Sequence, residues 1–491
     1  MDKAISKMGD KEWYIQNFKL FEQNLTCPPH RTETCPPLRT EKGRREGRRE
    51  GRRDGKSKTK LHLFRQDAIS KFDELDFPTT KNEEWKYTSV SDVLNHQFIP
   101  SCLQRDDFTH KPTIDNLLID IRNKNVLVFI NGFLSKDLSK INLSNPGVIV
   151  ESIETISSAQ NEIFELHFGK YSAYDNGFSA LNSAFAQDGA FIFIPEDQII
   201  EEPIYLIYLN GEENVNILSQ PRNLFVLGKN TQMKLVEVHE SNSQSPYLTN
   251  SLSEIIVGEN SIIDHYKIQN DSLNSFHISK IQVEQKANSK YTSHSISLGG
   301  SLTRNDINSV LNGKGCEANY YGLYFVDGKQ HVDNHTLVDH ATPHCFSNEL
   351  YKGILADDSK GVFNGKILVR KDAQKTNAYQ SNKNLLLSGN ARIDTKPQLE
   401  IFADDVRCTH GATVGQIDEE ALFYLRARGI DEENARSLLV NAFTNDILDF
   451  IKIDELKSKM NEIVFQKMIE VFSRAVPIIF SSLISDKTFV A

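Results

Sequence analysis

The fold is decided by residues 228–260, which read GKNTQMKLVEVHESNSQSPYLTNSLSEIIVGEN. The stretch begins and ends with the turn-forming triplets GKN and GEN, and between them apolar residues alternate with polar ones, as at Val236 and Val238. Alternation over a short run bounded by Gly and Asn is typical of a β-strand that ends in a turn. This part of the chain is therefore predicted to be a series of strands.

The same pattern extends in both directions, from about residue 121 to residue 415. Apolar residues with a period of two recur every ~10 to 20 residues, as at Val126 and Val128, Phe191 and Phe193, and Ile281 and Val283. Too few helical patterns intervene for a doubly wound sheet. Short, evenly spaced strands can close as a sandwich, a propeller or a solenoid, and without a strict repeat the pattern leaves all three open.

The two ends of the chain have helical periodicity. Residues 11–22 and 61–75 carry apolar side chains at helical spacing, and Pro78 ends the second segment. After residue 416 the helical period returns, with Asp418 and Asp431 as N-caps, Gly429 as a stop, and a third helix from about residue 453 to 474. We therefore predict a mainly β protein with a helical N-terminal domain (1–120), a β core (121–415) and a helical C-terminal domain (416–491).

Residues 24–60 interrupt the N-terminal domain with a basic, repetitive segment. It contains 12 Lys and Arg and 5 Asp and Glu, a net charge of +7, which leaves −17 for the rest of a chain whose total is −10. With few apolar residues it cannot pack, so we predict a disordered insertion. The alternative is an arm that binds nucleic acid or another anionic surface. Because the rest of the chain is acidic, we expect no nucleic acid partner.

Composition and missing motifs exclude several classes of protein. No apolar run in the 491 residues approaches the ~20 that a membrane span needs, and the N-terminus does not resemble a secretory signal. The six cysteines form no CxxC pair, which favours reduced thiols and a cytoplasmic location. The sequence lacks GxxxxGK[ST], GxSxG, HExxH and GxGxxG, so we expect no nucleotide on this chain and no ordinary hydrolase or dehydrogenase activity.

The densest group of potential metal ligands lies in the run HVDNHTLVDHATPHC, residues 331–345. Imidazole and thiolate suit Zn²⁺ or Fe²⁺, so a metalloenzyme is one hypothesis. The other, which we favour because the spacing matches no closed zinc site, places these residues on separate strands and a turn around Pro343, with imidazoles bonded to Asp333 and Asp339. The five candidates are His331, His335, His340, His344 and Cys345.

A second pair of candidates, Cys408 and His410, lies in the run ADDVRCTHGATVG. On a strand, residues i and i+2 point to the same face, so the thiol and the imidazole would lie side by side. Arg407 or a protonated His410 would favour the thiolate, the form that binds iron or accepts sulfur. The alternative is a packed cysteine beside a hydrogen-bonded histidine. Two ligands are too few for a closed site, so a partner chain would have to supply the others.

Several long runs of the sequence are distinctive: ARIDTKPQLEIFADDVRCTHGATVGQIDEEALFYLRARGI (391–430), PTTKNEEWKYT (78–88), ALNSAFAQDGAFIFIP (180–195), and the runs 322–345 and 349–388. These runs resemble the SufD branch of the SufB/SufD family of the SUF iron–sulfur cluster machinery. The resemblance covers essentially the whole chain apart from the basic insertion. The CTHGATVG run resembles SufD and not SufB.

The resemblance implies a right-handed parallel β-helix between helical terminal domains. It also implies a scaffold subunit that is not an enzyme, forms a heterodimer with a SufB-like paralogue and binds a SufC-like ABC ATPase through its C-terminal helices. In these helices the candidate anchors are Phe423, Leu439 and Phe443.

The cofactor implied is a transient Fe–S cluster or iron at the interface with SufB. His410 would help to build or hold it, with Cys408 as its neighbour. Sulfur supply belongs mainly to SufB, so the resemblance assigns none to Cys316 or Cys345, and it makes the histidine-rich run part of the β-helix.

Overall fold

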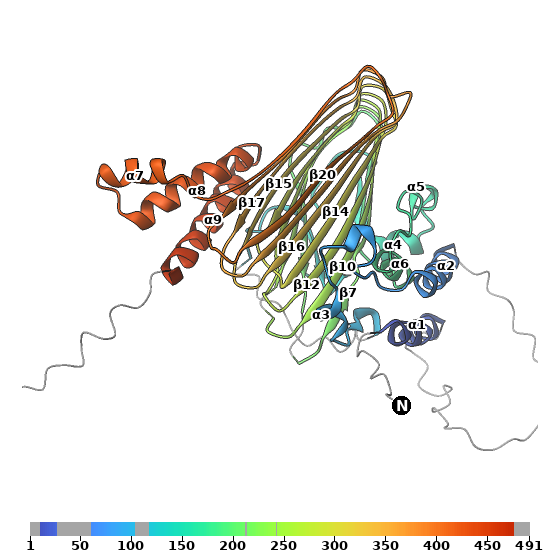
Figure 1. The fold of residues 1–491 in the computed structure, drawn as a ribbon. Coiled ribbons are helices and arrows are strands. Elements are labelled where there is room, and N and C mark those ends of the chain that lie inside the picture. Colours follow the sequence, from blue (N-terminus) through green and yellow to red (C-terminus); the bar gives the residue numbers. More distant parts are fainter. Residues whose placement is uncertain (1–9, 27–59, 104–116, 212–213, 242, 476–491) are drawn as a thin grey trace, which may run out of the picture.

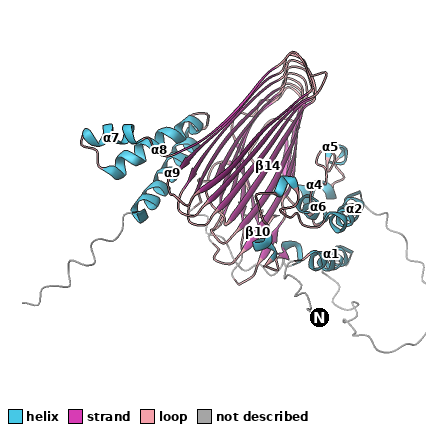
Figure 2. Cartoon of the chain, in the orientation of Figure 1, coloured by secondary structure: helices cyan, strands magenta, loops and turns pink. Residues whose placement is uncertain are grey.

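The protein is a long β-helix with helices on two of its sides (Figures 1 and 2). The computed structural model describes residues 10–26, 60–103, 117–211, 214–241 and 243–475. The predicted insertion therefore lies outside the described residues, except that its first residues and Lys60 belong to the helices α1 (Lys11–Thr26) and α2 (Lys60–Leu75).

Two sheets form the β-helix, and the chain passes from one to the other at each turn. One sheet has the order β20-β18-β16-β14-β12-β10-β8-β5-β4, and the other β21-β19-β17-β15-β13-β11-β9-β6-β2-β3. In the first sheet, all neighbouring strands between β5 and β20 are parallel. In the second sheet, all neighbouring strands between β2 and β21 are parallel. Each coil thus gives one strand to each sheet, which confirms the mainly β fold class with a parallel β-helix core.

The strands of the first sheet are β4 (Ile149–Ser152), β5 (Ala190–Ile194), β8 (Arg222–Leu227), β10 (Tyr247–Val257), β12 (Phe276–Gln285), β14 (Leu302–Leu311), β16 (His331–His340), β18 (Lys360–Val369) and β20 (Arg392–Ile401). In addition, β7 (Ile217–Ser219) pairs with β10, and β1 (Ile99–Pro100) pairs with β7. The strands of the second sheet are β2 (Asn125–Ile130), β3 (Phe133–Leu134), β6 (Ile204–Leu209), β9 (Gln232–Glu240), β11 (Ile262–Asn270), β13 (Lys290–Ser297), β15 (Glu317–Val326), β17 (Phe346–Leu355), β19 (Asn377–Leu386) and β21 (Arg407–Gly415).

The triplets that bound residues 228–260 form one stacked corner of the β-helix. Asn230 and Asn260 both have left-handed backbone, with φ of +55° and +57°, which Asn tolerates better than most residues. The Asn260 side-chain amide donates to Asn230 Oδ1 at 3.0 Å. A Cβ on Gly258 would lie 2.2 Å from the carbonyl oxygen of Gly228, so the coils can stack this closely only with glycine. The Gly and Asn residues that mark the turns in the sequence therefore also allow neighbouring coils to approach closely.

Helices from the N-terminal part cover the outer face of the first sheet. The predicted segments 11–22 and 61–75 are confirmed as helices, and α2 ends at Leu75, before Pro78. Phe72 of α2 and Phe178 of α6 pack with Leu248 and Phe276 of the sheet. The short helices α4 (Ile153–Ser158), α5 (Glu162–His167) and α6 (Gly177–Ala184) were not predicted. The other short elements are η1 (Glu83–Trp85), α3 (Ser91–Leu94) and η2 (Ser101–Leu103).

The C-terminal helices follow the prediction closely. They are α7 (Glu419–Ala427), α8 (Glu432–Leu448) and α9 (Asp454–Ala475). The side chains of Asp418 and Asp431 cap α7 and α8, and Gly429 has φ of +89° between them. Helices α8 and α9 pack with the outer face of the second sheet in one apolar cluster, whereas α7 projects away from the β-helix (Figure 1).

Candidate functional site at the C-terminal end of the β-helix

The last coil of the β-helix is uncovered. Within the described residues, β20 pairs only with β18 and β21 only with β19, so each has one free edge. Most residues of β21 are exposed, whereas alternate residues of β19 are buried. At the other end of the two sheets the pairing is antiparallel, between β3 and β2 in one sheet and between β4 and β5 in the other. The two ends therefore differ, and the C-terminal end presents open strand edges.

Cys408 and His410 lie on the inward side of this last coil. In the parallel register Cys408 pairs with Ala378 and His410 with Gln380, both of which are buried in the interior. Paired residues of parallel strands point to the same side of a sheet, so Cys408 and His410 share that side, roughly 6.6 Å apart along the strand. His410 is exposed and has no side-chain hydrogen bond among the described residues. Its imidazole is accessible from the open end.

The environment of Cys408 differs from the expectation. Its side chain is half-buried against a small apolar cluster that includes Val369, Ala373 and Ala378. This burial raises the pKa of the Cys408 thiol, although its hydrogen bond with the Ala378 backbone acts in the opposite direction. From the sequence, Arg407 or a protonated His410 was predicted to favour the thiolate. That expectation is wrong in this structure, because burial favours the neutral thiol.

A polar row that sequence reasoning missed lies directly behind His410. Gln380, in register with His410, donates to Glu349 Oε2 at 3.2 Å, and Thr336 donates to the same oxygen at 2.6 Å. The second carboxyl oxygen of Glu349 and Oε1 of Gln380 are buried without a partner among the described residues. Burial raises the pKa of Glu349 to about 7. The sequence signal was the period-two run Gln380, Asn382 and Asn384, which places amides where a β-helix interior would be apolar.

The histidine-rich run does not form a metal centre. His331, His335 and His340 lie on one strand, β16, and not on separate strands as predicted, while His344 lies in the following turn. In the described part of the chain, no three His, Cys, Asp or Glu side chains are grouped so that they could hold a metal ion. His335 contacts Asp333 at 3.0 Å, as predicted.

The partner predicted for the other aspartate of this run is wrong. Asp339 pairs with Arg370 at 2.6 Å and not with a histidine. His340 instead contacts Ser347 at 2.9 Å.

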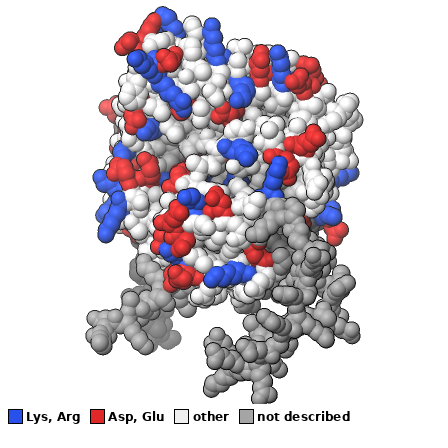
Figure 3. Space-filling view, turned by 90° about the vertical axis from the view of Figure 1, so that its right-hand side faces the viewer, with Lys and Arg blue, Asp and Glu red and all other residues white. Residues whose placement is uncertain are grey.

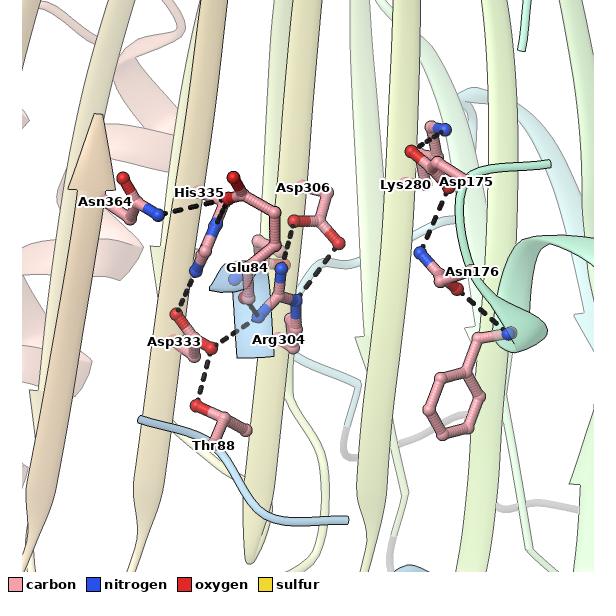
Figure 4. A network of polar contacts seen from close by, with 12 residues as sticks. Glu84, Thr88, Asp175, Asn176, Lys280, Arg304, Asp306, Asp333, His335 and Asn364 are labelled. Carbon is pink, nitrogen blue, oxygen red and sulfur yellow. Dashed lines mark hydrogen bonds and ion pairs between the residues drawn. The ribbon is translucent and has the colours of Figure 1, made fainter. Parts of the chain in front are cut away.

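His335 belongs to a polar network that fixes the N-terminal segment to the first sheet (Figure 4). Arg304 contacts Asp333 at 2.7 Å, Asp306 at 2.9 Å and the backbone carbonyl of Glu84 at 2.8 Å. Its guanidinium lies 3.9 Å from the centre of the Trp85 ring. A cleft of about 470 Å³ adjoins this network. Because these charged groups already pair with one another, the network is structural.

Comparison with known proteins identifies the family. A model described as the SufBD core domain of SUF system FeS cluster assembly matches residues 208–443, and a model of the SufBD N-terminal region matches residues 50–206. The chain belongs to the SufBD family. The resemblance noted in the sequence is confirmed, and the chain is an iron–sulfur cluster assembly protein of this family.

Individual relatives align with this SufBD-family chain over most of their own length. It is 34% identical to an iron–sulfur cluster assembly SufBD family protein of Synechocystis sp., over 82% of this chain and 89% of the relative. It is 30% identical to the iron–sulfur cluster assembly protein SufD of Escherichia coli, over 80% and 89%. It is 28% identical to the chloroplastic protein ABCI7 of Arabidopsis thaliana, over 81% and 84%.

The three anchors predicted in the C-terminal helices of this SufBD-family chain differ in exposure. Phe423 on α7 is 73% exposed. Leu439 and Phe443 on α8 are partly buried against the core, and Lys352 lies 4.1 Å from the centre of the Phe443 ring. Two exposed apolar side chains that were not predicted, Tyr424 and Leu438, are found on the same two helices.

The surface of the chain shows no broad area of one charge in the view of Figure 3, where acidic and basic side chains of the described residues are interspersed. None of the helices in the described ranges is long and apolar enough to cross a membrane.

Proposed function

We propose that this SufBD-family chain is a scaffold subunit without ATPase activity, on which a nascent Fe–S cluster is built at an interface with a SufB-like paralogue. A SufC-like ABC ATPase would be the second partner. The observation that carries the proposal is the uncovered last coil, with the imidazole of His410 accessible at its open end. The free cysteines in the described ranges suit a reducing cytoplasm, where we propose that it acts.

The open end suits a partner of the same fold. The free edges of β20 and β21 present backbone N–H and C=O groups that another pair of strands can satisfy. Exposed apolar side chains accompany these edges at Ile401, Phe402 and Val414. A second β-helix placed against this end would extend both sheets and bury these side chains. We therefore propose the heterodimer with a SufB-like chain at this end.

The chemistry of the two candidate ligands is unequal. A neutral imidazole binds iron without first losing a proton, and His410 is accessible. The Cys408 thiol must lose its proton before it can bind metal, and burial opposes this step. We therefore propose His410 as the main ligand from this chain and Cys408 as the secondary one, with the remaining ligands supplied by the partner. The Fe–S cluster is cargo that must later leave, which is compatible with few ligands on each chain.

Replacing His410 by alanine is expected to lower the iron and acid-labile sulfide of the anaerobically purified three-protein complex several-fold, with a smaller loss for Cys408→Ala. The matched control is Thr409→Ala, on the same exposed strand but pointing to the other side, and it should leave both contents unchanged. Size-exclusion chromatography should show the intact complex in every case. A normal iron and sulfide content in His410→Ala would move the ligands entirely to the partner chain.

We also propose that residues 416–491 dock the ATPase, since this chain lacks a nucleotide-binding motif of its own. The exposed face of α7 supports this role, because an aromatic side chain such as Phe423 is otherwise costly to leave in water.

Phe423→Ala is expected to weaken ATPase binding by roughly tenfold or more, measured by calorimetry with the purified ATPase. Leu166→Ala, on α5, removes a side chain of similar exposure, 63%, from the N-terminal part and should leave binding unchanged. Equal affinities for the two variants would place the docking surface elsewhere.

A further inference from the structure

Two cysteines that the proposed function does not use lie side by side at one corner of the β-helix. Cys316 and Cys345 directly precede β15 and β17, whose first residues, Glu317 and Phe346, are paired in parallel register. The backbone N–H of Phe346 donates to the carbonyl oxygen of Cys316 at 2.9 Å. Both side chains are buried in the same interior cluster. The two thiols therefore occupy equivalent positions on consecutive coils.

Both thiols converge on one backbone group. Sγ of Cys316 lies 2.9 Å from the carbonyl oxygen of Gly313, and Sγ of Cys345 lies 3.4 Å from the same oxygen. Glycine is needed there, because a Cβ on Gly313 would lie 2.0 Å from the backbone nitrogen of Ala287 on the preceding coil. The tight corner turn thus holds the two sulfur atoms next to one another.

The pair shares a proton unequally. A hydrogen bond between the two thiols lowers the pKa of Cys345 and raises the pKa of Cys316, so thiolate character concentrates on Cys345. The hydroxyl of Thr342, 3.5 Å from Cys345 Sγ, further stabilises the thiolate. Of the two thiols, Cys345 is therefore the one that loses its proton more readily.

The surroundings distinguish this pair from the other described cysteines. The thiols lie beneath exposed corner turns, since Lys314 and His344, close to the two cysteines in sequence, are both exposed. Cys102 packs with a different apolar cluster, and Cys408 lies at the start of β21, where Arg407 is in register with Asn377 of the preceding coil. Cys316 and Cys345 thus lie next to one another, directly beneath the exposed residues of two corner turns.

We propose that Cys316 and Cys345 form a redox-active dithiol, which hydrogen peroxide converts to a disulfide and a thiol reductant restores. Adjacent strands of a sheet lie about 4.7–4.9 Å apart, within the range of roughly 4.4–6.8 Å between Cα atoms that a disulfide accepts. The proposal does not depend on His410 or on any partner.

The reaction needs peroxide as the only co-reactant. The Cys345 thiolate attacks one peroxide oxygen, the O–O bond breaks, and hydroxide leaves as Cys345 becomes a sulfenic acid. Hydroxide takes the proton of Cys316, and the new thiolate attacks Cys345 Sγ, which breaks its S–O bond and forms the S–S bond. A second hydroxide leaves. The two sulfur atoms lose two electrons in total, and the peroxide gains them.

The test uses the full-length chain, reduced and then treated anaerobically with hydrogen peroxide. After alkylation with N-ethylmaleimide, peptide mapping by mass spectrometry should find a peptide pair that links Cys316 to Cys345, two hydrogens lighter than the separate peptides. Dithiothreitol should restore both thiols. Cys102→Ala is the matched control and should keep the link, whereas Cys345→Ala should lose it and leave Cys316 as an alkylated thiol. Two alkylated thiols in the peroxide-treated wild-type chain, or a link from Cys345 to another cysteine, would overturn the proposal without bearing on the scaffold function.

Discussion

Replacing Arg304 by methionine is expected to lower the free energy of unfolding by about 3–5 kcal/mol, because it breaks a buried ion pair and leaves the Asp333 carboxylate without the guanidinium. Arg304 is 2% exposed and Asp333 1%. The carboxylate of Asp333 is held in its charged form largely by Arg304 and His335, which keep its pKa below the ordinary value against the effect of burial. Without the guanidinium, Asp333 must either stay charged in the interior or take up a proton.

The N-terminal segment should loosen in the same variant. Arg304 also donates to the backbone of Glu84 and stacks on Trp85. Its loss therefore removes two contacts between this segment and the sheet, although Thr88 still donates to Asp333 (Figure 4). Arg304→Lys should recover only part of the stability, since an ammonium cannot reach two carboxylates and the ring at once.

Urea unfolding followed by circular dichroism measures the loss. Lys366→Met is the matched control. Lys366 on β18 lines the same cleft as Arg304 and pairs with Glu400 at 2.7 Å, but its side chain is partly exposed. A partly exposed pair contributes about 0–1 kcal/mol. If Arg304→Met and Lys366→Met lost equal stability, the network would not hold the segment in the way described.

Local signals in the sequence predicted the elements, and long-range pairing decided how they close. The caps Asp418 and Asp431 act within three residues, so they could be read directly from the sequence. The choice between sandwich, propeller and solenoid depends on pairs such as Val236 with Tyr266, about one coil apart, which no local pattern contains. Only the resemblance to a known family supplied that choice.

The helices that were missed are short but carry readable caps. Asn176 accepts hydrogen bonds from the backbone of Phe178 and Ser179 at the start of α6, and Asn161 caps α5 in the same way. A helix of six or eight residues shows too few turns for its apolar period to stand out beside the neighbouring strands. The caps were the only local signal, and weighting them more heavily would have found these helices.

At the candidate site, the sequence predicts to which side of the strand the side chains point, but it does not predict which residues surround them. The i, i+2 spacing predicts that Cys408 and His410 share a side of the strand, because that depends only on the strand period. The pKa of Cys408 depends on residues from earlier coils, such as Val369 and Ala378, which bury it. For the same reason, the partial burial of Leu439 and Phe443 could not be read from α8 alone: their packing partners come from the core.

The last prediction concerns Glu349, the buried carboxyl group behind His410. Burial raises its pKa in the folded chain to about 7, above the ordinary value of 4.5. Between these two pH values the folded state keeps the proton while the unfolded state releases it, so stability falls as the pH rises. A shift of this size corresponds to a loss of up to about 3 kcal/mol between pH 4.5 and pH 8.

Glu349→Gln should remove this part of the pH dependence. Glutamine has nearly the same shape, can accept from Thr336, and brings an amide donor close to the unpaired Oε1 of Gln380. The quantity to compare is the free energy of unfolding of the variant minus that of the wild-type chain. This difference should be higher at pH 8 than at pH 5, by up to about 3 kcal/mol. Urea unfolding of both chains at the two pH values measures this, and the other titrating groups cancel in the comparison.

The exposed residue Glu201 provides the control, since Glu201→Gln should follow the wild-type chain at both pH values. If Glu349→Gln lost as much stability as the wild type between pH 5 and pH 8, Glu349 would have to be ionised in the folded protein throughout that range.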